Sequence, residues 1–186
     1  MFNLANKITL LRILMTPLVV ILLYFQGPTL CILAALVFIF AAITDWVDGY
    51  IARHAGMVTS MGKFLDPLAD KVLICSVLIM FVQLGWAPAW VVIIIVCREL
   101  VVTGLRAMAI DEGIVLAADR FGKAKTVLQI AAIIPITLHY PLFGLKLWPV
   151  GEALLYASMA VAVFSGVNYC RYFYRHAASV APGQSA

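Results

Sequence analysis

Acidic side chains interrupt a chain that is otherwise built from apolar segments. Of its 186 residues, 65% are hydrophobic and 12% charged, and the mean hydropathy is +1.05. This composition needs lipid around it and excludes a soluble domain. Four aspartates nevertheless lie close together, at Asp45, Asp48, Asp66 and Asp70. Ionised carboxylates are costly in a lipid environment, so any fold of this chain must supply them with a compensating cation and a polar cavity.

The spacing of the aspartates predicts two acidic helix faces. At about 100° per residue, each face combines acids with small residues. The first face holds Asp45, Asp48, Gly49 and Ala52, and the second holds Gly62, Asp66 and Asp70. Two such faces joined by a short turn can meet, and four hard oxygen donors suit Mg²⁺ or Mn²⁺. An ion or proton pathway in a transporter is the alternative use of buried carboxylates.

The same segment resembles the signature of the CDP-alcohol phosphatidyltransferase family. The chain matches each fixed position of that signature, which reads Asp-x2-Asp-Gly-x2-Ala-Arg, then eight residues, then Gly-x3-Asp-x3-Asp. The resemblance implies a membrane enzyme that moves a phosphatidyl group from CDP-diacylglycerol to an alcohol and releases CMP. It also implies two divalent cations, a homodimer, and metal ligands at Asp45, Asp48 and Asp66. Asp70 is then the general base for the acceptor hydroxyl, a metal ligand, or both.

Small residues beside the acids predict where the nucleotide of CDP-diacylglycerol lies. Gly49 and Ala52 allow close approach to the helix backbone, Gly62 has the same interpretation, and Arg53 can reach a phosphate.

A further polar helix face lies near the start of the chain, at Asn6, Thr9 and Arg12. The family shows a related Asn-Thr-Arg pattern beside the nucleotide site, usually after a proline, whereas Ala5 precedes Asn6 here. The alternative is a helix cap followed by an arginine that extends to the membrane surface.

Proline and glycine residues divide the chain into six expected spans, at residues 8–25, 29–53, 62–84, 87–110, 120–140 and 149–171. With these boundaries twelve of the thirteen Lys and Arg residues share one side, the exception being Lys146. The positive-inside rule then puts both termini in the cytoplasm and the protein in the cell inner membrane. The expected fold is all-α, with six transmembrane helices around a cytoplasm-facing polar cavity. Residues 1–176 form one domain, and 177–186 a disordered tail.

Helix length sets the depth of the polar residues. Too few residues separate Lys71 from Gly85 to cross about 30 Å of hydrocarbon. The third helix must therefore continue back through Asp70 and Asp66, with Pro67 inside it. Arg98 also lies deep, about three turns from the outer turn, and Glu99 is expected to pair with a base or a helix end.

Basic residues of the fourth and fifth spans form a second candidate site, for the acceptor phosphate: Arg98, Arg106, Lys123 and Lys125. Their segments resemble those of family members that use glycerol 3-phosphate. The alternative is that they are topology charges at helix ends.

The expected reaction gives phosphatidylglycerophosphate and CMP. Serine, inositol or its phosphate, and phosphatidylglycerol remain alternative acceptors, and a cation transporter or a non-catalytic assembly factor are the other classes. The net charge of +4 does not indicate nucleic acid, because the basic residues form no soluble patch. The single cysteines, Cys31, Cys75, Cys97 and Cys170, are interpreted as apolar packing residues.

Overall fold

The computed structural model describes the backbone at residues 4–55, 60–111, 120–141 and 144–180. Within these ranges, side chains are described except at 4–9, 45–55, 60–70, 110–111, 120–121, 174 and 176–180. The described helices are α1 (Leu4–Tyr24), α2 (Pro28–Ala55), α3 (Ser60–Gln83), α4 (Ala89–Asp111), α5 (Arg120–Thr137) and α6 (Trp148–Val180). Each corresponds to one of the six apolar segments expected from the sequence, so the all-α architecture is confirmed.

Helix boundaries follow the expected punctuation, with one substantial difference. α6 continues to Val180, nine residues beyond its expected end at Arg171 and through the first four residues of the segment 177–186. No proline or glycine interrupts the sequence until Pro182, so nothing in the local sequence ends the helix earlier. The predicted disorder of residues 177–186 is therefore wrong for residues 177–180, which are helical. Residues 181–186 lie outside the described part of the chain.

Glycine ends α3 by a hydrogen-bonded cap. Gly85 has a φ of 72°, in the left-handed region that a side chain disfavours. The N–H of Trp86 donates to the carbonyl of Phe81 at 2.8 Å, and the N–H of Gly85 donates to that of Val82 at 3.1 Å. This pairing satisfies the last carbonyls of the helix and turns the chain sharply toward α4.

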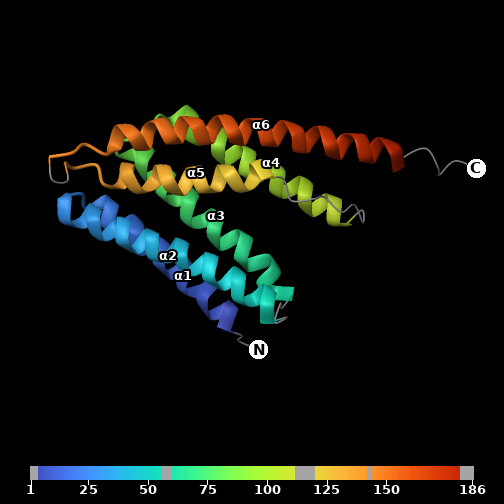
Figure 1. Ribbon diagram of the computed structural model, residues 1–186, viewed down its shortest axis with the longest axis horizontal. Helices are drawn as coiled ribbons and strands as arrows, with labels where there is room; N and C mark the ends of the chain where they lie inside the picture. Colours follow the sequence, from blue (N-terminus) through green and yellow to red (C-terminus); the bar gives the residue numbers. More distant parts are fainter. Residues whose placement is uncertain (1–3, 56–59, 112–119, 142–143, 181–186) are drawn as a thin grey trace, which may run out of the picture.

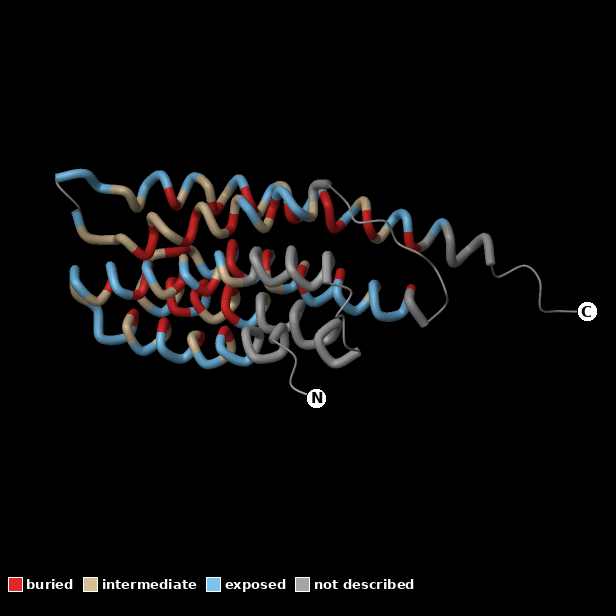
Figure 2. The backbone as a smooth tube through the Cα atoms, turned by 60° about the horizontal axis from the view of Figure 1, so that its bottom comes forward, coloured by how far each residue is buried: buried red, intermediate tan, exposed pale blue. Residues whose placement is uncertain are grey.

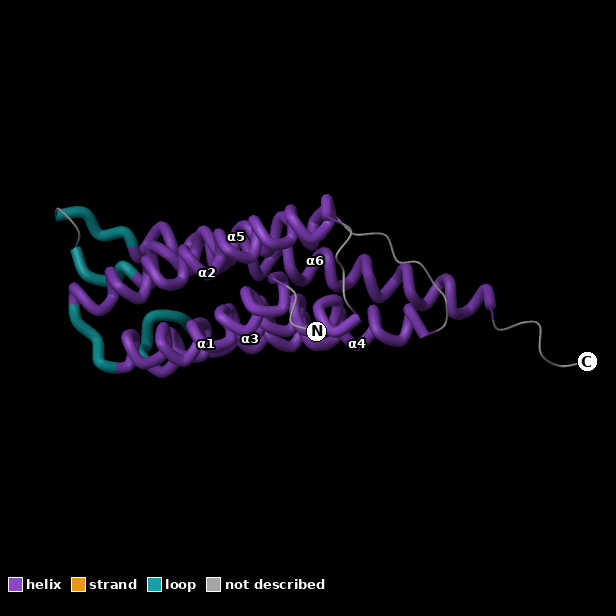
Figure 3. The backbone as a smooth tube through the Cα atoms, turned by 90° about the horizontal axis from the view of Figure 1, so that it is seen from below, coloured by secondary structure: helices purple, strands orange, loops and turns teal. Residues whose placement is uncertain are grey.

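The described loops gather at one end of the bundle (Figure 3), which we call the loop end. They connect α1 to α2, α3 to α4 and α5 to α6. Six consecutive spans imply that these three connections lie at the same end of the bundle, and the structure has them there. We call the opposite end, where α2 and α4 finish and α3 and α5 begin, the polar end.

Two groups of helices make up the bundle (Figure 1). α5 and α6 run side by side and α4 packs on α6, while α1 packs on both α2 and α3. α6 approaches α5 closely at Gly151. A Cβ atom there would lie 2.6 Å from Cγ1 of Ile136 and 2.8 Å from the carbonyl oxygen of Ala132. Glycine is therefore what allows α6 to pack directly on the backbone of α5.

The helices of the bundle carry both buried and exposed residues along their length (Figure 2). Among the buried ones, the apolar residues Phe38, Phe81 and Ile133 are almost fully enclosed. Outside, large apolar residues remain exposed, for example Leu100 at 66% and Val127 at 66%. An apolar exterior of this kind is unfavourable in water and is matched by a lipid environment.

Helix length supports the same conclusion. Among the described residues, Trp148–Phe173 of α6 is long and apolar enough to cross a membrane. Three shorter apolar segments are Leu10–Tyr24, Pro28–Thr44 and Lys71–Gln83.

Candidate active site

The aspartate segment occupies the two helices that meet at the polar end (Figure 1). α2 ends at Ala55 and α3 begins at Ser60, so four residues join them. The start of α3 before Asp66 confirms that this helix continues back through Asp70 and Asp66, with Pro67 inside it. The predicted ligands and nucleotide-contacting residues all lie on described helices: Asp45, Asp48, Gly49, Ala52 and Arg53 on α2, Gly62, Asp66 and Asp70 on α3, and Asn6 and Thr9 on α1.

The side chains of these ten residues lie outside the described part of the structure. Their roles at a metal and nucleotide site therefore remain predictions. Among the described side chains, no group of three or more His, Cys, Asp or Glu residues is placed to hold a metal ion.

Arg12 lies on α1, the helix that packs on both α2 and α3. Arg12 is only 3% exposed, and its backbone carbonyl accepts a hydrogen bond from Oγ1 of Thr16 at 3.1 Å. An arginine that extends to the membrane surface would be exposed, so that alternative does not describe Arg12.

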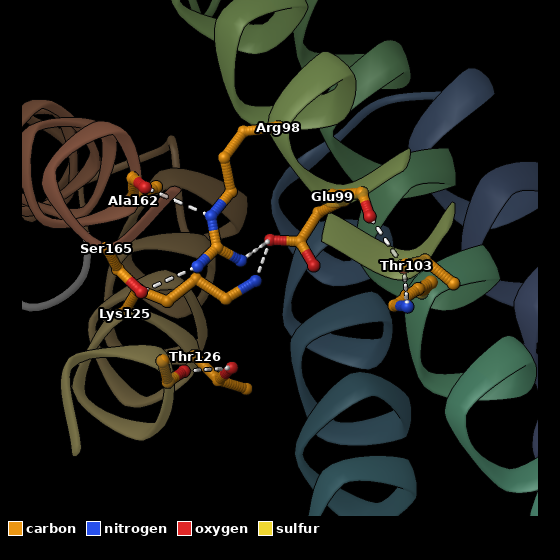
Figure 4. A network of polar contacts seen from close by, with 9 residues as sticks. Arg98, Glu99, Thr103, Lys125, Thr126, Ala162 and Ser165 are labelled. Atoms are coloured by element: carbon orange, nitrogen blue, oxygen red, sulfur yellow. Dashed lines mark hydrogen bonds and ion pairs between the residues drawn. The ribbon is translucent and has the colours of Figure 1, made fainter. Parts of the chain in front are cut away.

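A buried charge cluster joins α4 to α5 (Figure 4). We use this name for Arg98, Glu99 and Lys125. Nη1 of Arg98 lies 3.2 Å from Oε1 of Glu99, and Nζ of Lys125 contacts the same carboxylate oxygen. The three side chains are 10%, 11% and 7% exposed, respectively. The expected pairing of Glu99 with a base is confirmed.

Helix α6 fixes the orientation of Arg98. Its Nε donates to the carbonyl oxygen of Ala162 at 3.0 Å, and Nη2 donates to Oγ of Ser165 at 2.8 Å. Gly166 leaves room for the arginine stem, since a Cβ there would lie 3.1 Å from Cγ of Arg98. These contacts with α6 therefore fix the plane of the guanidinium group and point it toward Glu99. A guanidinium fixed in this way is pre-organised to bind a second anion.

The charge balance of the cluster favours an anion. Two cations share one carboxylate, so these three side chains carry a net charge of +1. A phosphate oxygen is a partner that a planar guanidinium and an ammonium both accept.

Gln129 adds a neutral donor one helical turn from Lys125, on the same face of α5. It is 1% exposed, and its Nε2 has no hydrogen-bond partner among the described residues. A buried amide donor without an acceptor costs about 1–3 kcal/mol, so the position suits a ligand oxygen or a bound water.

A polar contact connects the aspartate-bearing helix to the charge cluster. Lys71, the residue after Asp70, contacts Oγ1 of Thr103 through its Nζ. That hydroxyl donates to the backbone carbonyl of Glu99 at 2.6 Å. No role in the site was predicted for Lys71 from the sequence. Thr103 follows Glu99 by four residues, and this spacing alone could have predicted that the two lie on the same face of the helix.

Two of the four predicted phosphate ligands lie apart from the charge cluster. Arg106 and Lys123 are exposed, whereas Arg98 and Lys125 are largely buried. Arg106 is eight residues further along α4, about 12 Å toward its end, and Lys123 is turned roughly 160° from Lys125 around α5. Ser165, which holds Arg98, had no distinguishing sequence pattern.

The chain is similar to known proteins over most of its length. The profile of the CDP-alcohol phosphatidyltransferase family matches residues 2–164. A CDP-diacylglycerol–glycerol-3-phosphate 3-phosphatidyltransferase of Bacillus subtilis (strain 168) is 44% identical over 181 residues, covering 91% of this chain and 94% of that protein. A probable phosphatidylglycerophosphate synthase of Mycobacterium tuberculosis (strain H37Rv, ATCC 25618) is 42% identical, covering 90% and 79% respectively.

A third relative, from Rickettsia typhi (strain ATCC VR-144 / Wilmington), carries the same name as the Bacillus protein. It is 36% identical over 170 residues, which cover 91% of this chain and 96% of that protein. The profile match and these identities over nearly the full length of the chain give one conclusion: the chain belongs to the CDP-alcohol phosphatidyltransferase family.

Proposed function

We propose that this protein transfers the phosphatidyl group of CDP-diacylglycerol to glycerol 3-phosphate, forming phosphatidylglycerophosphate and CMP. The single observation that carries the choice of acceptor is the buried pair of cations, Arg98 and Lys125, around Glu99. Serine and inositol have no phosphate, so a site for them needs no converging cations. The Bacillus and Rickettsia relatives are both named as glycerol-3-phosphate 3-phosphatidyltransferases, which supports the same acceptor.

The acceptor phosphate would bind to the buried charge cluster. Arg98 offers a planar donor pair that α6 already orients, and Lys125 offers a point charge on the neighbouring helix. Glu99 offsets part of the positive charge of the two cations before the acceptor arrives, and the phosphate then adds further negative charge. Nε2 of Gln129 is a further donor on the same face.

The aspartates would serve the donor side of the reaction. Four carboxylates are a donor set that fits Mg²⁺ or Mn²⁺. Two such ions, when bound, would neutralise charge on the diphosphate as CMP leaves. Asp70 takes the proton from the acceptor hydroxyl, whose oxygen forms a bond to the lipid-side phosphorus while the bond from that phosphorus to the CMP oxygen breaks. Gly49, Ala52, Arg53, Gly62, Asn6 and Thr9 border the nucleotide.

The membrane arrangement follows from charge. The connections at the loop end contain a single cation, Lys146, which is exposed. We infer six spans in the cell inner membrane, both termini in the cytoplasm, and a cavity that opens at the polar end. The protein is expected to act as a homodimer, as the family resemblance implies.

A release assay tests this function. Purified protein is supplied with CDP-diacylglycerol and Mg²⁺, and CMP is measured with glycerol 3-phosphate, serine, inositol, inositol phosphate or phosphatidylglycerol as acceptor. CMP release that depends on glycerol 3-phosphate is the expected result. Preference for another acceptor would reject the assignment while leaving the family intact.

A further inference from the structure

A groove of about 560 Å³ lies between α4 and α6, apart from the aspartate-bearing helices. We call it the α4–α6 groove. Its walls are mostly aliphatic and include Val101 of α4 and Val163 and Val167 of α6. These three valines remain 52%, 42% and 45% exposed, so the groove is open along its length.

Positive charge marks one end of the groove. Arg171 and Arg175 line it, are both exposed, and are one helical turn apart on α6. Val163 lies twelve residues before Arg175, so the aliphatic wall and the arginines span about 18 Å along the helix axis. The groove therefore combines an elongated apolar channel with a basic mouth near the C-terminal end of α6, where that helix extends beyond its neighbours (Figure 1).

We propose that the α4–α6 groove binds an anionic phospholipid of the surrounding membrane. An acyl chain lies along the valines, and the phosphate contacts the guanidinium groups of Arg171 and Arg175. Apolar walls suit the chain, and a basic mouth between membrane helices suits an anionic headgroup. A second copy of this chain is a poor occupant, because two such faces would bring like charges together.

The groove also touches the buried charge cluster through one residue. Arg98 lines the groove, while its guanidinium is held by Ala162 and Ser165 of the same helix that forms the far wall. A lipid between α4 and α6 would therefore fix the spacing of the two helices that orient Arg98. The proposal stands on the groove itself and does not depend on which acceptor the enzyme uses.

Two native cysteines provide the test, because Cys97 and Cys170 line opposite walls of the groove. The protein in a neutral detergent is treated with a maleimide, and alkylation of each cysteine is followed by peptide mass spectrometry. Phosphatidylglycerol and phosphatidylcholine with identical acyl chains are the two probes. Phosphatidylglycerol is expected to slow alkylation of Cys97 and Cys170 at lower concentration than phosphatidylcholine. Cys75, on α3, is the internal control.

Matched variants identify the headgroup contact. Arg175→Gln should weaken protection by phosphatidylglycerol roughly fivefold, and the double variant with Arg171→Gln more, as expected for basic residues at a lipid surface. Lys146→Gln removes the same charge at the loop end and should change nothing. Equal protection by both lipids, no protection, or protection that appears with rising protein concentration alone would overturn the proposal. The last result would indicate a second copy in the groove. Because alkylation is measured without CDP-diacylglycerol, no phosphatidyl transfer takes place, and none of these outcomes bears on the proposed reaction.

Discussion

The two ends of the bundle are stabilised by different means. At the loop end, Trp86 stacks on His139 with ring centroids 4.3 Å apart, His139 also stacks on Trp148, and Gly151 seats α6 on α5. Nearer the polar end, the buried charge cluster takes the place of such contacts, with Glu99 between Arg98 and Lys125. Buried ion clusters often contribute less stability than apolar packing of the same volume. We therefore expect the loop end to contribute most of the stability, and the region of the charge cluster to serve the proposed ligand binding.

The largest effect should come from the aspartates. Asp48→Asn removes one carboxylate from a crowded acidic group, so turnover should be abolished, as it should be by a chelator. Thermal unfolding should shift little or upward, since repulsion between like charges is relieved. CMP release and the melting temperature are measured together. Near-normal turnover of the variant would show that Asp48 is not an essential metal ligand.

Two lysines of α5, one buried and one exposed, test whether burial in the charge cluster matters for acceptor binding. Lys125→Gln deletes a buried charge from the cluster and should raise the KM for glycerol 3-phosphate strongly, at a cost of about 2–3 kcal/mol in kcat/KM. Lys123→Gln deletes an exposed charge two residues away and should have a much smaller effect. Binding of CDP-diacylglycerol should stay nearly intact in both. Equal kinetic effects of the two changes would contradict the role given to burial.

A change at the loop end should act on stability instead. Gly151→Ala introduces a Cβ atom within 3 Å of the α5 backbone, so one helix must shift, at a cost of about 1–3 kcal/mol. Gly104→Ala is the matched control in α4, where nothing lies within 4 Å, and should stabilise by about 0.5–1 kcal/mol. Thermal unfolding measures both. If Gly151→Ala melted like the unmodified protein, the close helix contact would be wrong.

The smallest effect concerns pH at the same end. Burial lowers the pKa of His139 below its ordinary value of 6.5, and its Nδ1 has no hydrogen-bond partner among the described residues. The unfolded chain therefore binds a proton more readily, and stability should fall as pH drops from about 6.5 through the lowered pKa. His139→Phe keeps a ring between the tryptophans and should flatten this dependence. A melting temperature that varies with pH identically in both proteins would exclude His139 as its source.

The sequence predicted the helices well because their ends carry local signals. Gly85 ends α3 as the Pro and Gly pattern indicated, and helix length alone placed Asp66 and Asp70 inside α3. These features depend on residues close in the chain, and on the fixed rise of a helix through a membrane of known thickness.

The composition of the charge cluster could not be predicted in the same way. Choosing Lys125 over Lys123 requires knowing which face of α5 turns toward α4. In a membrane helix both the lipid-facing and the core-facing sides are apolar, so hydrophobic periodicity gives no answer. The contacts of Arg98 with Ala162 and Ser165 depend on how α4 crosses α6, more than sixty residues away in sequence.

The central claim, that the buried charge cluster receives the acceptor phosphate, is tested most directly by equilibrium binding. Glycerol 3-phosphate is titrated calorimetrically into the unmodified protein and into Arg98→Gln and Arg106→Gln, which remove a buried and an exposed charge from the same helix. Glycerol serves as the ligand without a phosphate. We predict at least roughly tenfold weaker binding of glycerol 3-phosphate by Arg98→Gln, near-normal binding by Arg106→Gln, and weak binding of glycerol throughout. Unchanged affinity in Arg98→Gln, with the fold intact by thermal unfolding, would contradict the account.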